Sequence, residues 1–366
     1  MKILKALITV MVVVCVALAG GLVIKNLNSD AVPDANVTSK ITVTDEEGKE
    51  EELTLTSINP LTGLDDLSAE ALGKRPIAIM INNIKRSLPQ YGIYDADIMF
   101  EIPVEGGITR MMALYSDYTK IPDVCSVRSC RYYFPIFAHG FDAVYFCFGS
   151  NQSLATPMLK KLGIDYFDGA SNFDQLVFGR DPNRIGSYPT EHTGYVKGPS
   201  IPAMLEKYSV RTDRKADKNE PVFNFSSVTE PVGERICDEL SIKFSNSYYS
   251  TFSYQPETKT YVKYHSGEKH MDQKAQKQLE FTNLFVLQTT VSLHGNGPLM
   301  DVDWKGGTGY YASAGTACQI RWEKPTAESD IKIYDTEGNE ITVNAGKSYF
   351  AVVNSVWITY RYVLVI

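Results

Sequence analysis

The strongest constraint on this chain is a long uncharged run near its N-terminus. Residues 6–24 read ALITVMVVVCVALAGGLVI, with lysines before and after them. At about 1.5 Å per residue, a helix over this run would be roughly 28 Å long, close to the thickness of the hydrocarbon core of a bilayer. The run has no polar face for packing against a soluble core. It therefore predicts a single-pass membrane helix within residues 1–25, with the body of the protein on the extracytoplasmic side of the cell membrane.

Two other interpretations of this segment stay open. Ala17-Leu18-Ala19 resembles a signal-peptide cleavage site, so the run is alternatively a signal that is removed. Cys15 is alternatively a lipidation site, although valines stand before it where small residues are expected. All three interpretations place the body outside the cytoplasm.

Residues 26–56 are polar and acidic and contain few large apolar side chains. Such a segment buries too little apolar surface to offset the entropy of folding, so it predicts a disordered acidic tether. A flexible chain of about 30 residues has an end-to-end distance of roughly 30 Å. The tether would therefore keep the folded body close to the membrane.

Composition and charge limit what the body can be. The chain has 366 residues, of which 44% are hydrophobic and 22% are charged, as in ordinary globular proteins of about two domains. A net charge of -7 argues against a nucleic-acid partner, which would require a basic surface. Five cysteines lie outside the apolar run, and we expect most of them to be buried free thiols.

The hydrophobic pattern predicts an α+β protein with a mixed α/β domain over residues 57–215 and a β-rich domain over residues 216–366. In the first domain, one face of a predicted strand carries Ile98, Phe100, Ile102 and Val104, and the other carries Met99, Glu101 and Pro103. Pro103 marks this strand as edge-like or bulged. In the second domain, turn residues recur between short alternating runs, which is typical of β-hairpins. The expected elements of the first domain are strands over 75–83, 96–104 and 142–148 and helices over 152–162 and 200–208.

Charged residues gather around a predicted hairpin. In Glu105-Gly106-Gly107-Ile108, two glycines between apolar runs indicate a tight two-residue loop. That loop would place Pro103 opposite Arg110, and Arg110 diagonal to Glu101 and Glu105. The pattern therefore predicts that Glu101, Glu105 and Arg110 form one charged cluster on one face of the sheet.

The two glutamates have two interpretations. They either form an ion pair with Arg110 across the strands or act as the acid and base of a glycosidase. Four residues along a strand span about 13 Å, whereas glycosidase carboxylates stand about 5–5.5 Å or 6.5–9.5 Å apart. A regular strand is thus too long for the catalytic pair, unless a bulge at Pro103 shortens it.

Arg128 and Arg131 occur in the segment VRSCR. On a helix they would share a face, and guanidinium groups bind carboxylates and phosphates bidentately. The alternative is that they neutralise Glu101 and Glu105 within the protein. We assign no catalytic residue and expect no metal and no cofactor: the run from Asp301 resembles the start of a calcium loop, but Lys305 and Ala312 occupy ligand positions.

Several motifs resemble the YerB-like family of bacterial envelope proteins. RPIAIMINN, Ala96-Asp97, Glu101, EGGITR and VRSCR occur in that family's order, and YVKYHSGEKHMD, FTNLFVL and GGTGYY resemble its second domain. The resemblance extends from about residue 58 to about residue 355. The family's domains have no known function, so the resemblance implies an envelope location without an activity. Many members look like lipoproteins, whereas Cys15 lacks the expected preceding residues.

These observations favour an envelope binding module. Its ligand would be an anionic or peptide-bearing cell-wall component or a membrane protein partner. Two alternatives remain: a hydrolase of envelope polymers with Glu101 or Glu105 as acid or base, and a structural partner of another membrane protein. The candidate ligand-binding residues are Asn83, Glu101, Glu105, Arg110, Arg128 and Arg131.

Overall fold

The structure is a computed structural model that describes residues 38–44, 50–171, 173–354 and 358–360. The chain divides into two compact units, Met1–Ile58 and Asn59–Ile366. In the first unit, strands β1 (Thr38–Thr44) and β2 (Glu50–Thr56) form an antiparallel pair.

These two strands fall within the predicted disordered tether, so that prediction is wrong for them. Their sequences, TSKITVT and EEELTLT, are rich in threonine and other residues that favour strands, and this preference outweighs the acidic composition. The predicted membrane segment and the rest of the tether lie outside the described residues. Among the described helices, none combines the length and the apolar character needed to cross a membrane.

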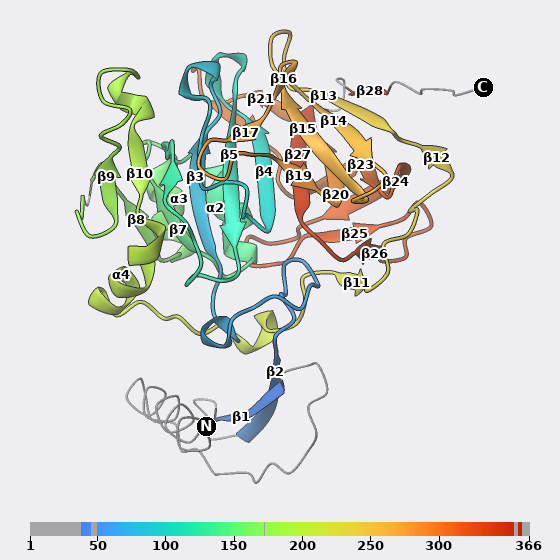
Figure 1. The fold of residues 1–366 in the computed structure, drawn as a ribbon, viewed down its shortest axis with the longest axis horizontal. Coiled ribbons are helices and arrows are strands. Elements are labelled where there is room, and N and C mark those ends of the chain that lie inside the picture. Colours follow the sequence, from blue (N-terminus) through green and yellow to red (C-terminus); the bar gives the residue numbers. More distant parts are fainter. Residues whose placement is uncertain (1–37, 45–49, 172, 355–357, 361–366) are drawn as a thin grey trace. The chain divides into compact units, whose positions relative to one another are not determined.

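The second unit is organised around one mixed sheet (Figure 1). Its strand order is β12-β24-β23-β20-β27-β4-β5-β3-β7-β8, and β25 also pairs with β24. The strands are β3 (Ile77–Asn82), β4 (Ile98–Pro103), β5 (Thr109–Tyr115), β7 (Val144–Cys147), β8 (Tyr166–Asp168), β12 (Arg235–Ile236), β20 (Asn283–Thr289), β23 (Gly306–Ser313), β24 (Thr316–Glu323), β25 (Lys332–Tyr334) and β27 (Ser348–Asn354).

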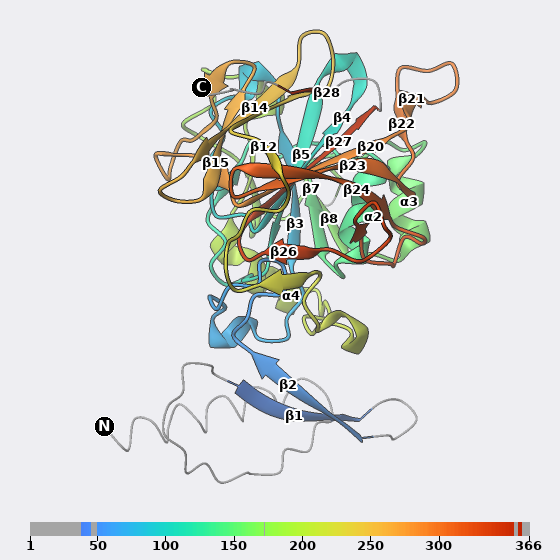
Figure 2. The ribbon, with the colours of Figure 1, turned by 90° about the vertical axis from the view of Figure 1, so that its right-hand side faces the viewer.

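The two faces of this sheet follow the predicted alternation. Phe100 and Ile102 of β4 belong to a core that includes Phe137 of helix α2 (Tyr133–Gly140) and Leu159 of helix α3 (Ala155–Leu162). Met99 belongs to a second core on the opposite face, which includes side chains of β13 (Glu239–Lys243) and β14 (Tyr249–Gln255). Figure 2 shows α2 and α3 on one side of the central strands, and β14 and β15 (Thr260–His265) on the other. Each face is therefore covered by a different layer.

Strands from both predicted domains meet in this sheet. β27 pairs in parallel with β4, with Ser348 opposite Ile98 and Ala351 opposite Glu101. β4 is thus paired on both sides, and the prediction that Pro103 makes it an edge strand is wrong. Pro103 is the last residue of β4 and lies beyond the final β27 pair, so its missing N–H interrupts no hydrogen bond to β27.

A smaller sheet covers the face that carries Met99. Its order is β16-β15-β14-β13-β28, and β19 also pairs with β15. It contains β13 (Glu239–Lys243), β14 (Tyr249–Gln255), β15 (Thr260–His265), β16 (Glu268–Lys269), β19 (Glu280–Phe281) and β28 (Ile358–Tyr360).

The remaining elements complete the unit. The predicted helix near residues 200–208 is confirmed as α4 (Ile201–Lys207). The other strands are β6 (Val124–Cys125), β9 (Phe178–Arg180), β10 (Gly194–Val196), β11 (Asn224–Ser226), β17 (Met271–Asp272), β18 (Lys277–Gln278), β21 (Val291–Leu293), β22 (Met300–Val302) and β26 (Thr342–Asn344). The described residues thus form a mixed fold with many strands and few helices, and the five cysteines of the body are free thiols.

Candidate functional site

The β4–β5 hairpin is one residue out of the predicted register. Pro103 lies opposite Thr109, and Ile102 lies opposite Arg110. The loop therefore contains a turn of 3-10 helix, η3 (Glu105–Gly107), instead of the two glycines alone. Both glycines have positive φ, +73° and +70°, a conformation that glycine adopts without steric cost. The prediction that Pro103 faces Arg110 is wrong because the loop takes one more residue.

This shift separates the predicted cluster. Side chains alternate along a strand, so a one-residue change of register moves a side chain to the other face of the sheet. Arg110 shares the face of Ile102, on the side of α2 and α3, whereas Glu101 shares the face of Thr109, under the smaller sheet. The predicted grouping of Glu101 with Arg110 is therefore wrong, and only Glu105 stays with the arginines.

Glu101 lies at the centre of a buried polar network. Its side chain has no exposed surface, and neither does that of Lys263, whose Nζ lies 3.2 Å from Oε2. Four neutral groups donate hydrogen bonds to the carboxylate: Asn83 Nδ2 (3.0 Å), Thr109 Oγ1 (2.8 Å), Ser250 Oγ (3.1 Å) and Tyr349 OH (2.6 Å). The candidate residue Asn83 thus donates a hydrogen bond to Glu101, and it is itself fully buried.

The electrostatics of this network identify it as an internal ion pair. Burial alone would raise the pKa of Glu101, but Lys263, His265 and the hydrogen-bond donors hold it below its usual value. Burial lowers the pKa of Lys263, and Glu101 opposes that effect. His265 is also buried, and burial followed by the charge of Lys263 lowers its pKa to about 4. Glu101 is therefore an ionised, inaccessible carboxylate that joins the two sheets.

The arginines of VRSCR lie in a segment that enters the central sheet. β3 and β7 pair only as far as Ile79 and Phe146. Beyond that point, the Arg128 N–H donates to Met80 O on the β3 side (3.1 Å), and Phe148 N–H donates to Arg128 O from the β7 side (3.0 Å). The segment thus acts as a short strand between two diverging strands. Arg128 and Arg131 both precede α2, which begins at Tyr133. They therefore do not lie together on a helix face.

The guanidinium groups meet near the η3 loop. Arg131 binds the Glu105 carboxylate through Nε (2.6 Å) and Nη2 (2.8 Å). Arg110 Nη1 donates to Ser129 O (2.6 Å), and Arg128 Nη1 donates to the Glu191 backbone O (3.2 Å). The structure therefore brings together four of the predicted residues: Glu105, Arg110, Arg128 and Arg131.

Positive charge exceeds negative charge in this group. Burial, followed by the charges of Arg131 and Arg128, lowers the pKa of Arg110 to about 9, although Glu105 opposes the change. Burial also lowers the pKa of Arg128, and its charged neighbours are Glu191, Arg131 and Arg180. Arg131 holds the pKa of Glu105 below its usual value against the effect of burial. We call Arg110, Arg128, Arg131 and Arg180 the arginine cluster; two carboxylates, Glu105 and Glu191, accompany it.

The arginine cluster stands where strands of one direction end. β3, β4, β7 and β8 all run opposite to β5, so their carboxyl ends share one edge of the sheet. In open sheets with parallel strands, ligands bind outside this edge. Arg180 comes from β9, stacks over Phe148 at 4.3 Å, and is a residue that the sequence pattern does not identify. Its sequence context offers no motif that would have found it.

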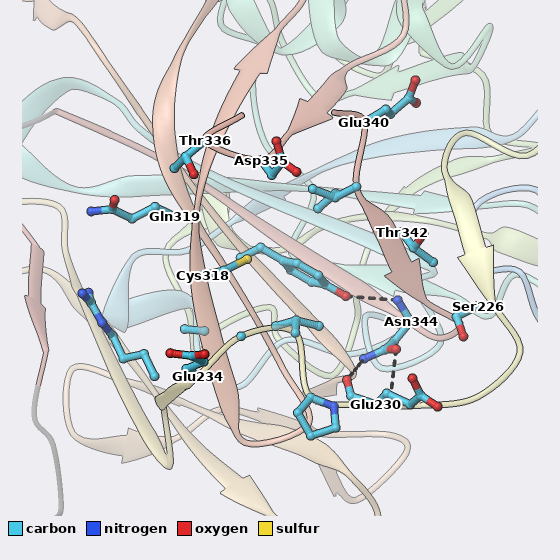
Figure 3. Close-up of a pocket in the computed structure, with 17 residues that line it drawn as sticks. Ser226, Glu230, Glu234, Cys318, Gln319, Asp335, Thr336, Glu340, Thr342 and Asn344 are labelled. Carbon is cyan, nitrogen blue, oxygen red and sulfur yellow. Dashed lines mark hydrogen bonds between the residues drawn. The ribbon is translucent and has the colours of Figure 1, made fainter. Parts of the chain in front are cut away.

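A separate groove of about 920 Å³ lies in the second part of the unit (Figure 3). Its walls come from the segment that leads into β12 and from the turn between β25 and β26, and Cys318 and Gln319 of β24 lie between them. None of the arginine cluster lines it. Within the part of the chain that the structure describes, no three His, Cys, Asp or Glu side chains gather in a way that would hold a metal ion.

Comparisons with known proteins identify similar chains. Two family profiles match, the N-terminal domain of a "Protein of unknown function (DUF3048)" over residues 61–211 and its C-terminal domain over residues 240–350. YerB of Bacillus subtilis (strain 168), which is named as a proposed lipoprotein, is 25% identical over 268 residues, or 72% of this chain and 77% of YerB. The crystal structure of YerB from Bacillus subtilis matches with a TM-score of 0.70 and 24% identity, covering 81% of this chain and 96% of that one. This last likeness concerns the fold alone.

Proposed function

Since the chain belongs to the YerB-like family, with its DUF3048 N- and C-terminal domains, we propose that it is an envelope-associated binding protein whose arginine cluster holds an anionic group. The ligand is an anionic or peptide-bearing cell-wall component or a membrane protein partner. The proposal places the body on the extracytoplasmic side of the cell membrane. The name of YerB and the apolar run over residues 6–24 support that location.

The observation that carries the proposal is the surplus of guanidinium groups. Arg110 is 6% exposed and stands beside like charges, while Arg131 already binds Glu105. A guanidinium has five N–H donors, and Arg128 uses one of them on a backbone carbonyl. A carboxylate or phosphate would accept such donors bidentately and would reduce the repulsion among the arginines.

The glutamates favour binding over hydrolysis. A general acid in a hydrolase needs a raised pKa so that it carries a proton at neutral pH. Glu101 has no exposed surface and Glu105 is held by Arg131, and the pKa of each lies below its usual value. We therefore assign neither glutamate to catalysis.

Titration of the full chain with purified wall fragments tests the proposal. We expect Arg128→Ala to weaken binding about tenfold and Arg128→Lys to restore part of the loss, because lysine keeps the charge without the planar fork. Arg321→Ala, which removes an exposed arginine paired with Glu323, is the matched control. Equal affinities of the wild type and Arg128→Ala for every fragment would contradict the role of the arginine cluster.

A further inference from the structure

The outer edge of β24 contains a gap in strand pairing. Its inner edge pairs with β23 along the whole strand. Its outer edge pairs with β12 at Thr316 and Ala317, and with β25 from Arg321 to Glu323. No described strand pairs with the outer edge over residues 318–320. β12 and β25 both run antiparallel to β24, so they lie one after the other along its outer edge. The three unpaired residues between them leave a gap of roughly 10 Å.

The backbone of Gln319 points into this gap. The carbonyl oxygen of Trp322 faces β23, because a Cβ built on Gly306 of β23 would lie 2.7 Å from that oxygen. The carbonyl oxygen of Ala317 faces outward, because a Cβ built on Gly233 would lie 2.6 Å from that oxygen. Gly233 lies just before β12, on the outer side of β24. Peptide groups alternate in direction along a strand, so the N–H and C=O of Gln319 point outward like those of Ala317. An open edge of this kind can pair with another extended segment over about three residues, because β12 and β25 occupy the positions on either side.

The groove of about 920 Å³ lies at the same gap. Glu234 and Arg235 line it at the β12 end, and Asp335 and Thr336 line it at the β25 end. Figure 3 shows the carboxylates of Glu234 and Asp335 on opposite sides of Cys318. The groove therefore surrounds the stretch of β24 that has no partner on its outer edge.

The charge of the groove favours a basic ligand. Asp335 accepts hydrogen bonds from the backbone of its own turn, and Glu340 pairs with Lys332 at 2.8 Å. Glu230 and Glu234 are exposed, and the structure gives their carboxylates no partner among the described residues. Two carboxylates thus remain on the wall next to β12, and Arg235 on the same wall offsets only one of them. The net negative charge would select and orient a cationic partner.

We propose that this groove binds an extended segment of a partner protein that carries lysine or arginine side chains, and that the segment adds to β24 as a short strand opposite Gln319. The residue opposite Gln319 exchanges backbone hydrogen bonds with its N–H and C=O. Basic side chains on the segment reach Glu230 and Glu234. This site is distinct from the arginine cluster, because it uses other strands and the opposite ligand charge.

A fluorescent heptapeptide of alternating lysine and valine tests the charge selection by anisotropy titration with the full chain. We expect saturable binding that the double variant Glu230→Lys/Glu234→Lys weakens about tenfold or more. The double variant Glu257→Lys/Glu268→Lys, which makes the same charge change at exposed residues outside the groove, is expected to bind as the wild type does. Equal weakening by both double variants, or equal binding of a glutamate–valine peptide, would overturn the proposal.

Backbone pairing is tested by the same peptide with every lysine and valine N-methylated. Only alternate residues of a strand turn their N–H groups towards its partner, so methylation of all of them removes the donors in either register. We expect it to bind about tenfold more weakly or worse. The amide of Gln319 is expected to exchange with deuterium more slowly when the unmodified peptide is bound. Equal affinity of the methylated peptide, unchanged exchange at Gln319, or no binding at millimolar peptide would each refute strand addition. Arg128→Ala is expected to leave peptide binding unchanged, which separates this site from the proposed function.

Discussion

Glu101 and Glu105 lie four residues apart in the sequence, but one is buried and the other is partly exposed. Glu101 is sealed between two sheets with Lys263, whereas the Glu105 side chain is 20% exposed and binds Arg131 at the surface. The structure shows where the partner of Glu101 comes from. In TYVKYH, alternate residues are buried, so Lys263 shares the inner face with Tyr261 and His265. A lysine on an inward-facing position predicts a buried carboxylate partner, but not which carboxylate.

The buried ion pair leads to a prediction about stability. Glu101→Gln leaves Lys263 charged and unpaired, and Lys263→Met leaves Glu101 without its cation, so each is expected to reduce the free energy of unfolding by about 3–5 kcal/mol. The double variant Glu101→Gln/Lys263→Met removes both charges and is expected to lose much less than the sum of the single losses. Urea unfolding of the four proteins measures this. Additive losses would show that the two residues do not stabilise each other.

At the scale of the element, loops decide where the charged residues lie. The strand pattern around residues 98–115 predicts a hairpin, and the hairpin is present. The number of residues in its loop is not set by the apolar pattern, because Glu105 fits either a strand end or a turn. The VRSCR segment likewise gains its position from hydrogen bonds to β3 and β7, which are distant partners that a local pattern does not specify.

Two glycines with similar backbone angles allow the contribution of loop packing to stability to be measured. Gly92 (φ +77°) and Gly106 (φ +73°) both favour glycine, but a Cβ on Gly92 would lie 2.2 Å from Asp123 O, whereas nothing lies within 4 Å of one on Gly106. We expect Gly106→Ala to reduce the free energy of unfolding by about 1 kcal/mol, and Gly92→Ala to reduce it by about 1–3 kcal/mol more.

Thermal unfolding of the two glycine variants measures the difference. Because both substitutions carry the same backbone strain, the extra loss in Gly92→Ala reports the close approach to the segment that precedes VRSCR. Equal losses in the two variants would mean that this segment shifts without cost.

At the scale of the whole molecule, one sheet passes through both halves of the family's sequence. The parallel pairing of β4 with β27 joins a strand matched by the N-terminal family profile to the end of the part matched by the C-terminal profile. Phe100 of β4 stacks on Phe350 of β27 with ring centroids 4.9 Å apart. The division into two domains near residue 215 therefore remains a prediction. Strands from both sides of that division pack in the same sheet.

This shared sheet predicts cooperative folding. We expect the unit Asn59–Ile366 to unfold in one calorimetric transition, and a fragment of residues 59–215 to remain unfolded, because it would expose the apolar edge of β4 that β27 covers. Circular dichroism and amide chemical-shift dispersion of the fragment provide the measurement. Native-like dispersion in the isolated fragment, or two separate transitions in the whole unit, would contradict the expectation.

By itself, the sequence determined the properties that depend on neighbouring residues. These are the alternation that assigns β4 its two faces, the helices near residues 155 and 201, the β-rich second half and the arginine-rich segment. Only the tertiary structure decided which distant groups meet: Glu101 with Lys263, Arg131 with Glu105, and β12 with β25 around an open stretch of β24. The physical reason is that register and strand order depend on loop length and on packing between segments far apart in the chain, whereas local patterns record only which side of each element is buried.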